Sequence, residues 1–174
     1  MNIYLLILLR IIHILSGTLW IGAAISYLFF FKPSVKAIGP AGPQFMEVLA
    51  ERRKYPLFMM IVSLLTVLAG GILYLNASGG FNLAWMKTGP GLGFTIGSLA
   101  ALVAFFVGGL GIGPTAAKMG ALGQQIGMAD GKPTPEQVST LQALEKKLSR
   151  AELVDFVALT ASILTMATAR YWTF

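Results

Sequence analysis

His13 follows Arg10 by three residues inside the first long apolar segment, Ile3–Phe31. An ionisable side chain at membrane depth is costly, and it is by default a candidate functional group. Residues three apart share a helix face. There an imidazole could ligate haem iron, while the guanidinium pairs with a propionate carboxylate. The chain contains no other histidine and no cysteine, so any imidazole chemistry has to use His13.

Gly17 and Trp20 continue the face that carries His13. In the haem interpretation, Gly17 leaves room for a flat macrocycle, and both residues belong to the cofactor-binding set. The alternative interpretation is structural. His13 would then be hydrogen-bonded to a neighbouring helix, and Arg10 would extend outward to the headgroups. The sequence leaves both interpretations open.

Met166 is the candidate for a second iron ligand, because it is expected at the membrane depth of His13. His/Met ligation is a known haem arrangement. A methionine that fills a gap in the core is the alternative, and a five-coordinate iron or a second His13 from another chain would also serve. Arg170 follows Met166 by one turn and either lies at the headgroups or turns toward a propionate.

Methionine thioethers also suit Cu(I), so copper handling is a further alternative. Met59 and Met60 are adjacent and therefore point in different directions on a helix. The chain shows no phosphate loop, dinucleotide fingerprint or nucleophile–base pair, so no catalytic residue is predicted.

The composition is that of a membrane protein, with a mean hydropathy of +0.74, 56% hydrophobic residues and 11% charged residues. The net charge of +6 comes from cations beside apolar segments, so no nucleic-acid binding is expected. About 20 apolar residues cross a bilayer. We predict an all-α, four-transmembrane-helix bundle. It is a single integral membrane domain, 1–174, with spans at about 3–31, 56–75, 91–113 and 153–169.

The last span continues a helix that begins earlier. Thr134 and Gln137 form a capping-box pattern, and Pro135 suits the first helical position. Apolar residues then recur every three or four positions, which predicts a long amphipathic cytoplasmic extension of helix four. A helix over 134–170 would be roughly 55 Å long, so part of it projects beyond the bilayer or lies along its surface.

The connections between the spans predict the orientation. Ten of the 13 Lys and Arg residues lie in the first and third connections, and only Lys87 lies in the second. The positive-inside rule places connections one and three in the cytoplasm and both termini outside the inner (plasma) membrane of a bacterial cell. His13, Arg10 and Arg170 would then lie toward the outer side.

Two short patterns suggest further organisation. Pro33-Ser34 and Pro114-Thr115 end the first and third spans at equivalent places. They suggest two repeated helical hairpins, although chance explains so short a match equally well. Glycines four residues apart, at Gly93 and Gly97 among others, permit close helix packing. They allow close packing either within the bundle in the lipid bilayer or between chains, in a homo-oligomer or a larger membrane complex.

Asp155, near the start of the last span, could serve a proton relay. The interpretation that we favour is an anchor facing the basic residues Arg52–Lys54 or Arg150.

The run from His13 to Gly22 (HILSGTLWIG) resembles the first-helix signature of a group of small bacterial membrane proteins. The group includes CopD-like copper-resistance domains, HemJ-type protoporphyrinogen oxidases and several four-helix families, which the chain resembles most. The resemblance implies that His13 is a haem or metal ligand. Together with the residues, it suggests a haem b-binding protein in electron transfer or porphyrin handling. The alternatives are a non-catalytic membrane subunit and copper handling.

Overall fold

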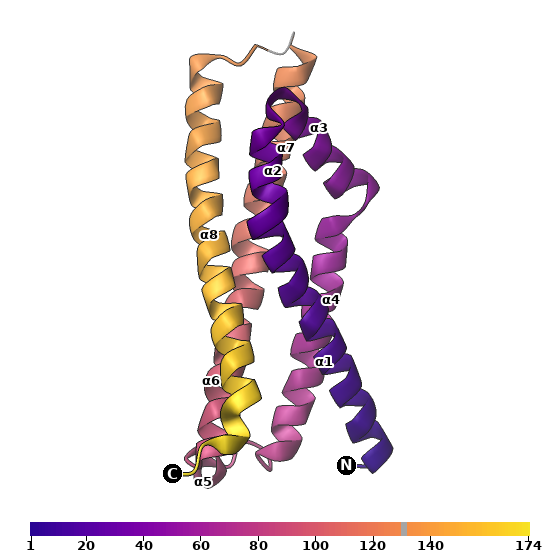
Figure 1. The fold of residues 1–174 in the computed structure, drawn as a ribbon, viewed down its shortest axis with the longest axis vertical. Helices are drawn as coiled ribbons and strands as arrows, with labels where there is room; N and C mark the ends of the chain where they lie inside the picture. The colour runs from indigo at the N-terminus through magenta and orange to yellow at the C-terminus, as the bar shows by residue number, and fades with distance from the viewer. Residues whose placement is uncertain (130–131) are drawn as a thin grey trace.

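The structure is a computed structural model that describes residues 1–129 and 132–174. Four long helical stretches lie side by side in an elongated bundle (Figure 1), and the described residues form no strand. The stretches Ile3–Ala37, Tyr55–Ala77, Gly89–Met128 and Pro135–Tyr171 are each long and apolar enough to cross a membrane. The predicted all-α, four-helix membrane bundle is confirmed.

Several of these stretches combine more than one kind of helix. The first contains α1 (Ile3–Ser26), the π-helix η1 (Tyr27–Phe31) and α2 (Lys32–Ala37), and it is followed by η2 (Gly39–Ala41), α3 (Gly42–Glu47) and η3 (Val48–Arg52). The second is α4 (Tyr55–Ala77), followed by the short α5 (Leu83–Met86). The third contains α6 (Gly89–Phe106), the π-helix η4 (Val107–Ile112) and α7 (Gly113–Met128). The fourth is α8 (Pro135–Thr168), which ends in η5 (Ala169–Tyr171).

The bundle consists of two helix pairs. α1 packs mainly on α4, and α6 packs mainly on α8. In each pair the first helix passes through a π-helix, η1 or η4, and then resumes α-helical geometry beside a proline, Pro33 or Pro114. The two halves therefore share a π-helix followed by a proline at the positions where the sequence predicted that the spans end.

A small core joins the two pairs. Trp20 of α1 packs with Val62 of α4, Ala104 of α6, and Ala158 and Leu159 of α8. Many large apolar side chains outside this core are exposed. In a bundle with four potential spans, such a surface is suited to lipid, which is as apolar as the side chains themselves.

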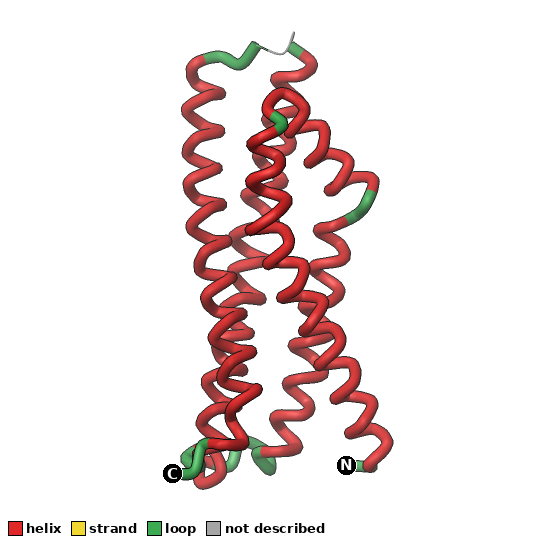
Figure 2. The backbone as a smooth tube through the Cα atoms, viewed as in Figure 1, coloured by secondary structure: helices red, strands yellow, loops and turns green. Residues whose placement is uncertain are grey.

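Both termini lie at one end of the bundle together with α5, whereas α3, the last turn of α7 and the first turn of α8 lie toward the other end (Figure 1). Segments outside the helices are short and confined to the ends or to the start of α4 (Figure 2). The two basic connections therefore share one end of the bundle, because two spans separate them along the chain.

The helix boundaries agree with the capping analysis. α8 begins at Pro135, the Thr134 hydroxyl accepts a hydrogen bond from the Gln137 amide at 3.2 Å, and the Gln137 side chain accepts one from the Thr134 amide at 2.9 Å. The third stretch is longer than the predicted span 91–113. The chain stays helical through the glycine-rich η4 and continues to Met128, where α7 runs along α8.

Candidate functional site

His13 lies between α1 and α4 and is held at one end of its ring. Its Nδ1 is 2.9 Å from the carbonyl oxygen of Thr66. A carbonyl only accepts, so Nδ1 carries a proton, and in the neutral imidazole Nε2 then holds the lone pair. Nε2 has no hydrogen-bond partner among the described residues, and the side chain is partly exposed. Histidines that ligate metals are oriented in this way, with the other ring nitrogen donating to a carbonyl or carboxylate.

Gly70 permits this position of the ring. A β-carbon added at Gly70 would lie 2.7 Å from Cε1 and 2.8 Å from Nδ1 of His13, closer than atoms in contact can approach. Sequence reasoning missed Gly70 as a residue of the site. The available signal was the glycine pair Gly70-Gly71 inside an apolar segment, since small residues in membrane helices let a neighbouring helix approach closely.

Hydrogen bonds between the hydroxyl groups of Thr66 in α4 and Ser16 in α1 also hold these two helices together. The Thr66 hydroxyl lies 2.9 Å from Ser16 Oγ and 2.7 Å from the Val62 carbonyl, and it can donate to one of the two. Ser16 in turn donates to the Ile12 carbonyl at 2.6 Å. Both hydroxyl-bearing residues are buried. Thr66 thus contacts α1 through its carbonyl and through its hydroxyl, which sets the register of His13.

Gly17 and Trp20 have packing roles in the structure. A β-carbon at Gly17 would lie 3.4 Å from the Thr66 methyl carbon, so Thr66 fills the space that the sequence assigned to a macrocycle. Trp20 is only 4% exposed and belongs to the core. These two residues anchor α1, and Arg10, one turn before His13, remains exposed without an ion pair among the described residues.

Met166 and Arg170 belong to the other helix pair. Ser162 donates a weak hydrogen bond to Met166 Sδ at 3.9 Å, and a β-carbon at Gly97 would lie 2.6 Å from Met166 Cγ. Arg170 is exposed in η5. The N-terminal end of α1 and the C-terminal end of α8 diverge (Figure 1). The structure therefore brings His13 together with Gly17 but leaves Met166 on the α6–α8 pair.

Two grooves of about 440 Å³ each also lie on the α6–α8 side, and His13 lines neither of them. Within the described residues, no group of three or more His, Cys, Asp and Glu side chains could hold a metal ion.

The glycine face of α6 packs against α8 of the same chain. A β-carbon at Gly93 would lie 2.8 Å from the Ala169 β-carbon, and Gly97 faces Met166, Thr165 and Ser162. Of the two uses that the sequence left open for these glycines, packing within the bundle accounts for Gly93 and Gly97.

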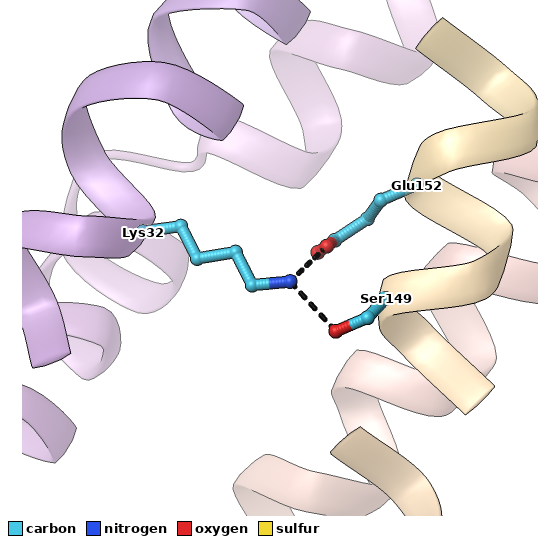
Figure 3. Close-up of polar contacts among 3 residues, drawn as sticks. All are labelled: Lys32, Ser149 and Glu152. Carbon is cyan, nitrogen blue, oxygen red and sulfur yellow. Dashed lines mark hydrogen bonds and ion pairs between the residues drawn. The ribbon is translucent and has the colours of Figure 1, made fainter. Parts of the chain in front are cut away.

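A second polar site, which sequence reasoning missed, joins the start of α2 to α8. The Lys32 ammonium group donates to the Glu152 carboxylate and, at 2.9 Å, to the Ser149 hydroxyl (Figure 3). It is the only ion pair among the described residues. Glu152 is 6% exposed, and its Oε1 is buried without a hydrogen-bond partner.

Asp155 lies one turn further along α8 and is also 6% exposed. We expected it to face Arg52–Lys54 or Arg150, and this is corrected: those residues are exposed, and no described cation pairs with Asp155. Its Oδ1 instead lies 4.0 Å from the β-carbon position of Gly108 in η4. The cation that reaches α8 is Lys32, because η1 extends the first stretch along that helix.

No family model, curated protein or solved structure matches this chain. Its function therefore has to be inferred from the geometry of its own residues.

Proposed function

We propose that this integral membrane protein binds haem b through His13 and takes part in electron transfer or porphyrin handling. One observation carries the proposal. His13 donates Nδ1–H to the Thr66 carbonyl and leaves the Nε2 lone pair without a partner among the described residues. In metal-binding proteins, a hydrogen bond from the other ring nitrogen fixes the tautomer and raises the basicity of the nitrogen that binds the metal. The first-helix resemblance to CopD-like and HemJ-type proteins supports the same residue.

Two side chains would hold the cofactor. His13 would supply Nε2 to the iron, and Arg10, exposed one turn away, would form a charge-assisted pair with a propionate. Gly17 and Trp20 would act indirectly, because they set the position of α1 against α4. When bound, haem supplies one-electron chemistry that amino-acid side chains lack.

Fewer contacts point to a second ligand for the iron. Met166 lies against Gly97 on the other helix pair, and it would have to leave that contact to reach an iron at His13. A five-coordinate iron, or His13 from a second copy, agrees better with the described contacts. Arg170, exposed in η5, is available to a propionate only on the α8 side.

The visible spectrum of the purified protein, expressed with added haem, tests this proposal. We expect a Soret band that His13→Ala abolishes while the protein still inserts and folds. Arg10→Ala should weaken haem retention but preserve the spectrum. Met166→Leu conserves volume, and it should change the reduced spectrum only if the thioether ligates iron. A wild-type protein without absorbance, or a Soret band unchanged in His13→Ala, would contradict the proposal.

A non-catalytic subunit of a larger membrane complex is the second candidate. It is supported by the hairpin of α7 and the adjoining part of α8, whose side chains are mostly exposed. Cross-linking from an exposed position such as Gln124 in native membranes would capture a partner subunit in this case. Copper handling gains no support from the described residues, because Met166 and His13 lie on different helix pairs.

A further inference from the structure

We propose that Glu152 and Asp155, held beside Lys32, form a site that binds one proton per chain. The site is separate from His13, and it does not depend on haem binding. Its ligand is a proton from the aqueous phase, taken up by a carboxylate to give the neutral acid. No other bond is formed or broken.

The first step is the burial of more negative than positive charge. Glu152 and Asp155 are each 6% exposed and lie on one face of α8, three residues apart. Lys32 pairs with Glu152 alone. With both acids ionised, the three groups would sum to a charge of −1, and an unpaired buried charge is strongly destabilising.

The second step is that oxygens without a partner face this site. Glu152 Oε1 is buried and lies beyond hydrogen-bond distance of every described donor, while Lys32 donates to Oε2. Asp155 makes no hydrogen bond or ion pair with any described residue. A buried group without a partner is expensive, and a proton on one carboxylate both removes the excess charge and supplies a donor.

The third step is that the surrounding elements offer no second cation. The Tyr27 hydroxyl of η1 is a neutral donor near Glu152 that lies beyond normal hydrogen-bond distance of Oε1. The ring of Tyr27 stacks on Tyr55 at a centroid distance of 6.1 Å. The Tyr55 hydroxyl is already used, since it donates to the Ala23 carbonyl at 2.8 Å. From the other side, η4 (Val107–Ile112) contributes no ionisable residue. Within the described structure, Lys32 is the one cation that forms an ion pair with either acid.

Both sides of the site are π-helical. Lys32 directly follows η1, and Gly108 of η4 faces Asp155. Such π-helical turns are frequent at functional sites. In this chain they bring Lys32 to α8 and place a glycine, rather than a polar side chain, opposite Asp155.

Infrared spectroscopy of the protein in bilayers tests the charge count. At neutral pH we expect a carboxylic-acid C=O band that shifts in deuterium oxide. Asp155→Asn should remove it. Glu152→Gln should remove it as well, although Asp155 is still present, because Lys32 then balances Asp155 without a proton. Lys32→Met should double the band, since both acids must then be neutral. Glu136→Gln, at an exposed position of α8, is the control and should leave the band unchanged.

Three results would overturn the proposal. The first is the absence of the band at neutral pH in the wild-type protein. The second is a band that Glu152→Gln leaves in place or that Lys32→Met fails to increase, which keeps the test decisive if Asp155→Asn does not fold. The third is loss of the wild-type band when sodium is added at constant pH, which would assign the site to a metal cation.

Discussion

Gly70 and His13 are in such close contact that a β-carbon at position 70 would overlap the imidazole, at 2.7 Å from Cε1. The same ring donates to the Thr66 carbonyl one turn before Gly70 in α4. Two features of one helix face, an accepting carbonyl and a missing side chain, thus determine where Nε2 of His13 lies.

Gly70→Ala should therefore displace His13 and break its hydrogen bond to Thr66. Overpacking at such a contact costs about 1–3 kcal/mol, more than the gain of up to about 1 kcal/mol in helix propensity. We expect a lower midpoint of thermal unfolding in detergent and weaker haem retention. Gly71→Ala is the matched control, because a β-carbon there meets nothing within 4 Å. Equal midpoints for the two variants would show that the ring contact has no energetic weight.

Gly97→Ala should destabilise the packing of α6 on α8. The new β-carbon would lie 2.6 Å from Met166 Cγ and 3.2 Å from the Ser162 carbonyl oxygen. The methionine can rotate away, but the carbonyl cannot. A loss of about 1–3 kcal/mol is expected for overpacking, measured by unfolding in detergent. Gly109→Ala, where a β-carbon meets nothing within 4 Å, should be neutral, and a cost as large as that of Gly97→Ala would argue against this account.

Hydropathy and capping patterns were sufficient to predict the four helices and the start of α8, because span length and caps are local properties. The choice of partners was not local. Met166 was expected at the depth of His13, but depth along a helix does not specify which neighbouring helix a side chain faces. Lys32 and Glu152 are 120 residues apart, and their pairing depends on how η1 turns toward α8. The roles of Gly70 and Thr66 likewise follow only from the packing of α1 on α4.

The orientation in the membrane is a prediction of the cation distribution. Because the chain has no cysteine, single cysteines can be introduced at the exposed positions Ala77 and Met128. We expect an impermeant thiol reagent applied to intact cells to label Ala77→Cys, at the end with both termini, and not Met128→Cys. Labelling of both positions would contradict the span count, and the reverse pattern would place His13 toward the cytoplasm.

The Lys32–Glu152 pair should respond asymmetrically to loss of either partner. Lys32 is 32% exposed and Glu152 is 6% exposed, so in Glu152→Gln the ammonium group keeps its contact with water while it balances Asp155, whereas Lys32→Met leaves a buried acid without its cation. Breaking a buried pair in that way costs about 3–5 kcal/mol, and we expect Glu152→Gln to cost clearly less.

The cost of Lys32→Met should also depend on pH. Its folded state has to hold one proton more than the wild-type folded state, so its stability should fall as the pH rises and recover in mildly acidic buffer. Unfolding of both variants at several pH values measures this. A larger loss for Glu152→Gln, or a pH-independent loss for Lys32→Met, would show that the buried carboxylates do not need neutralising.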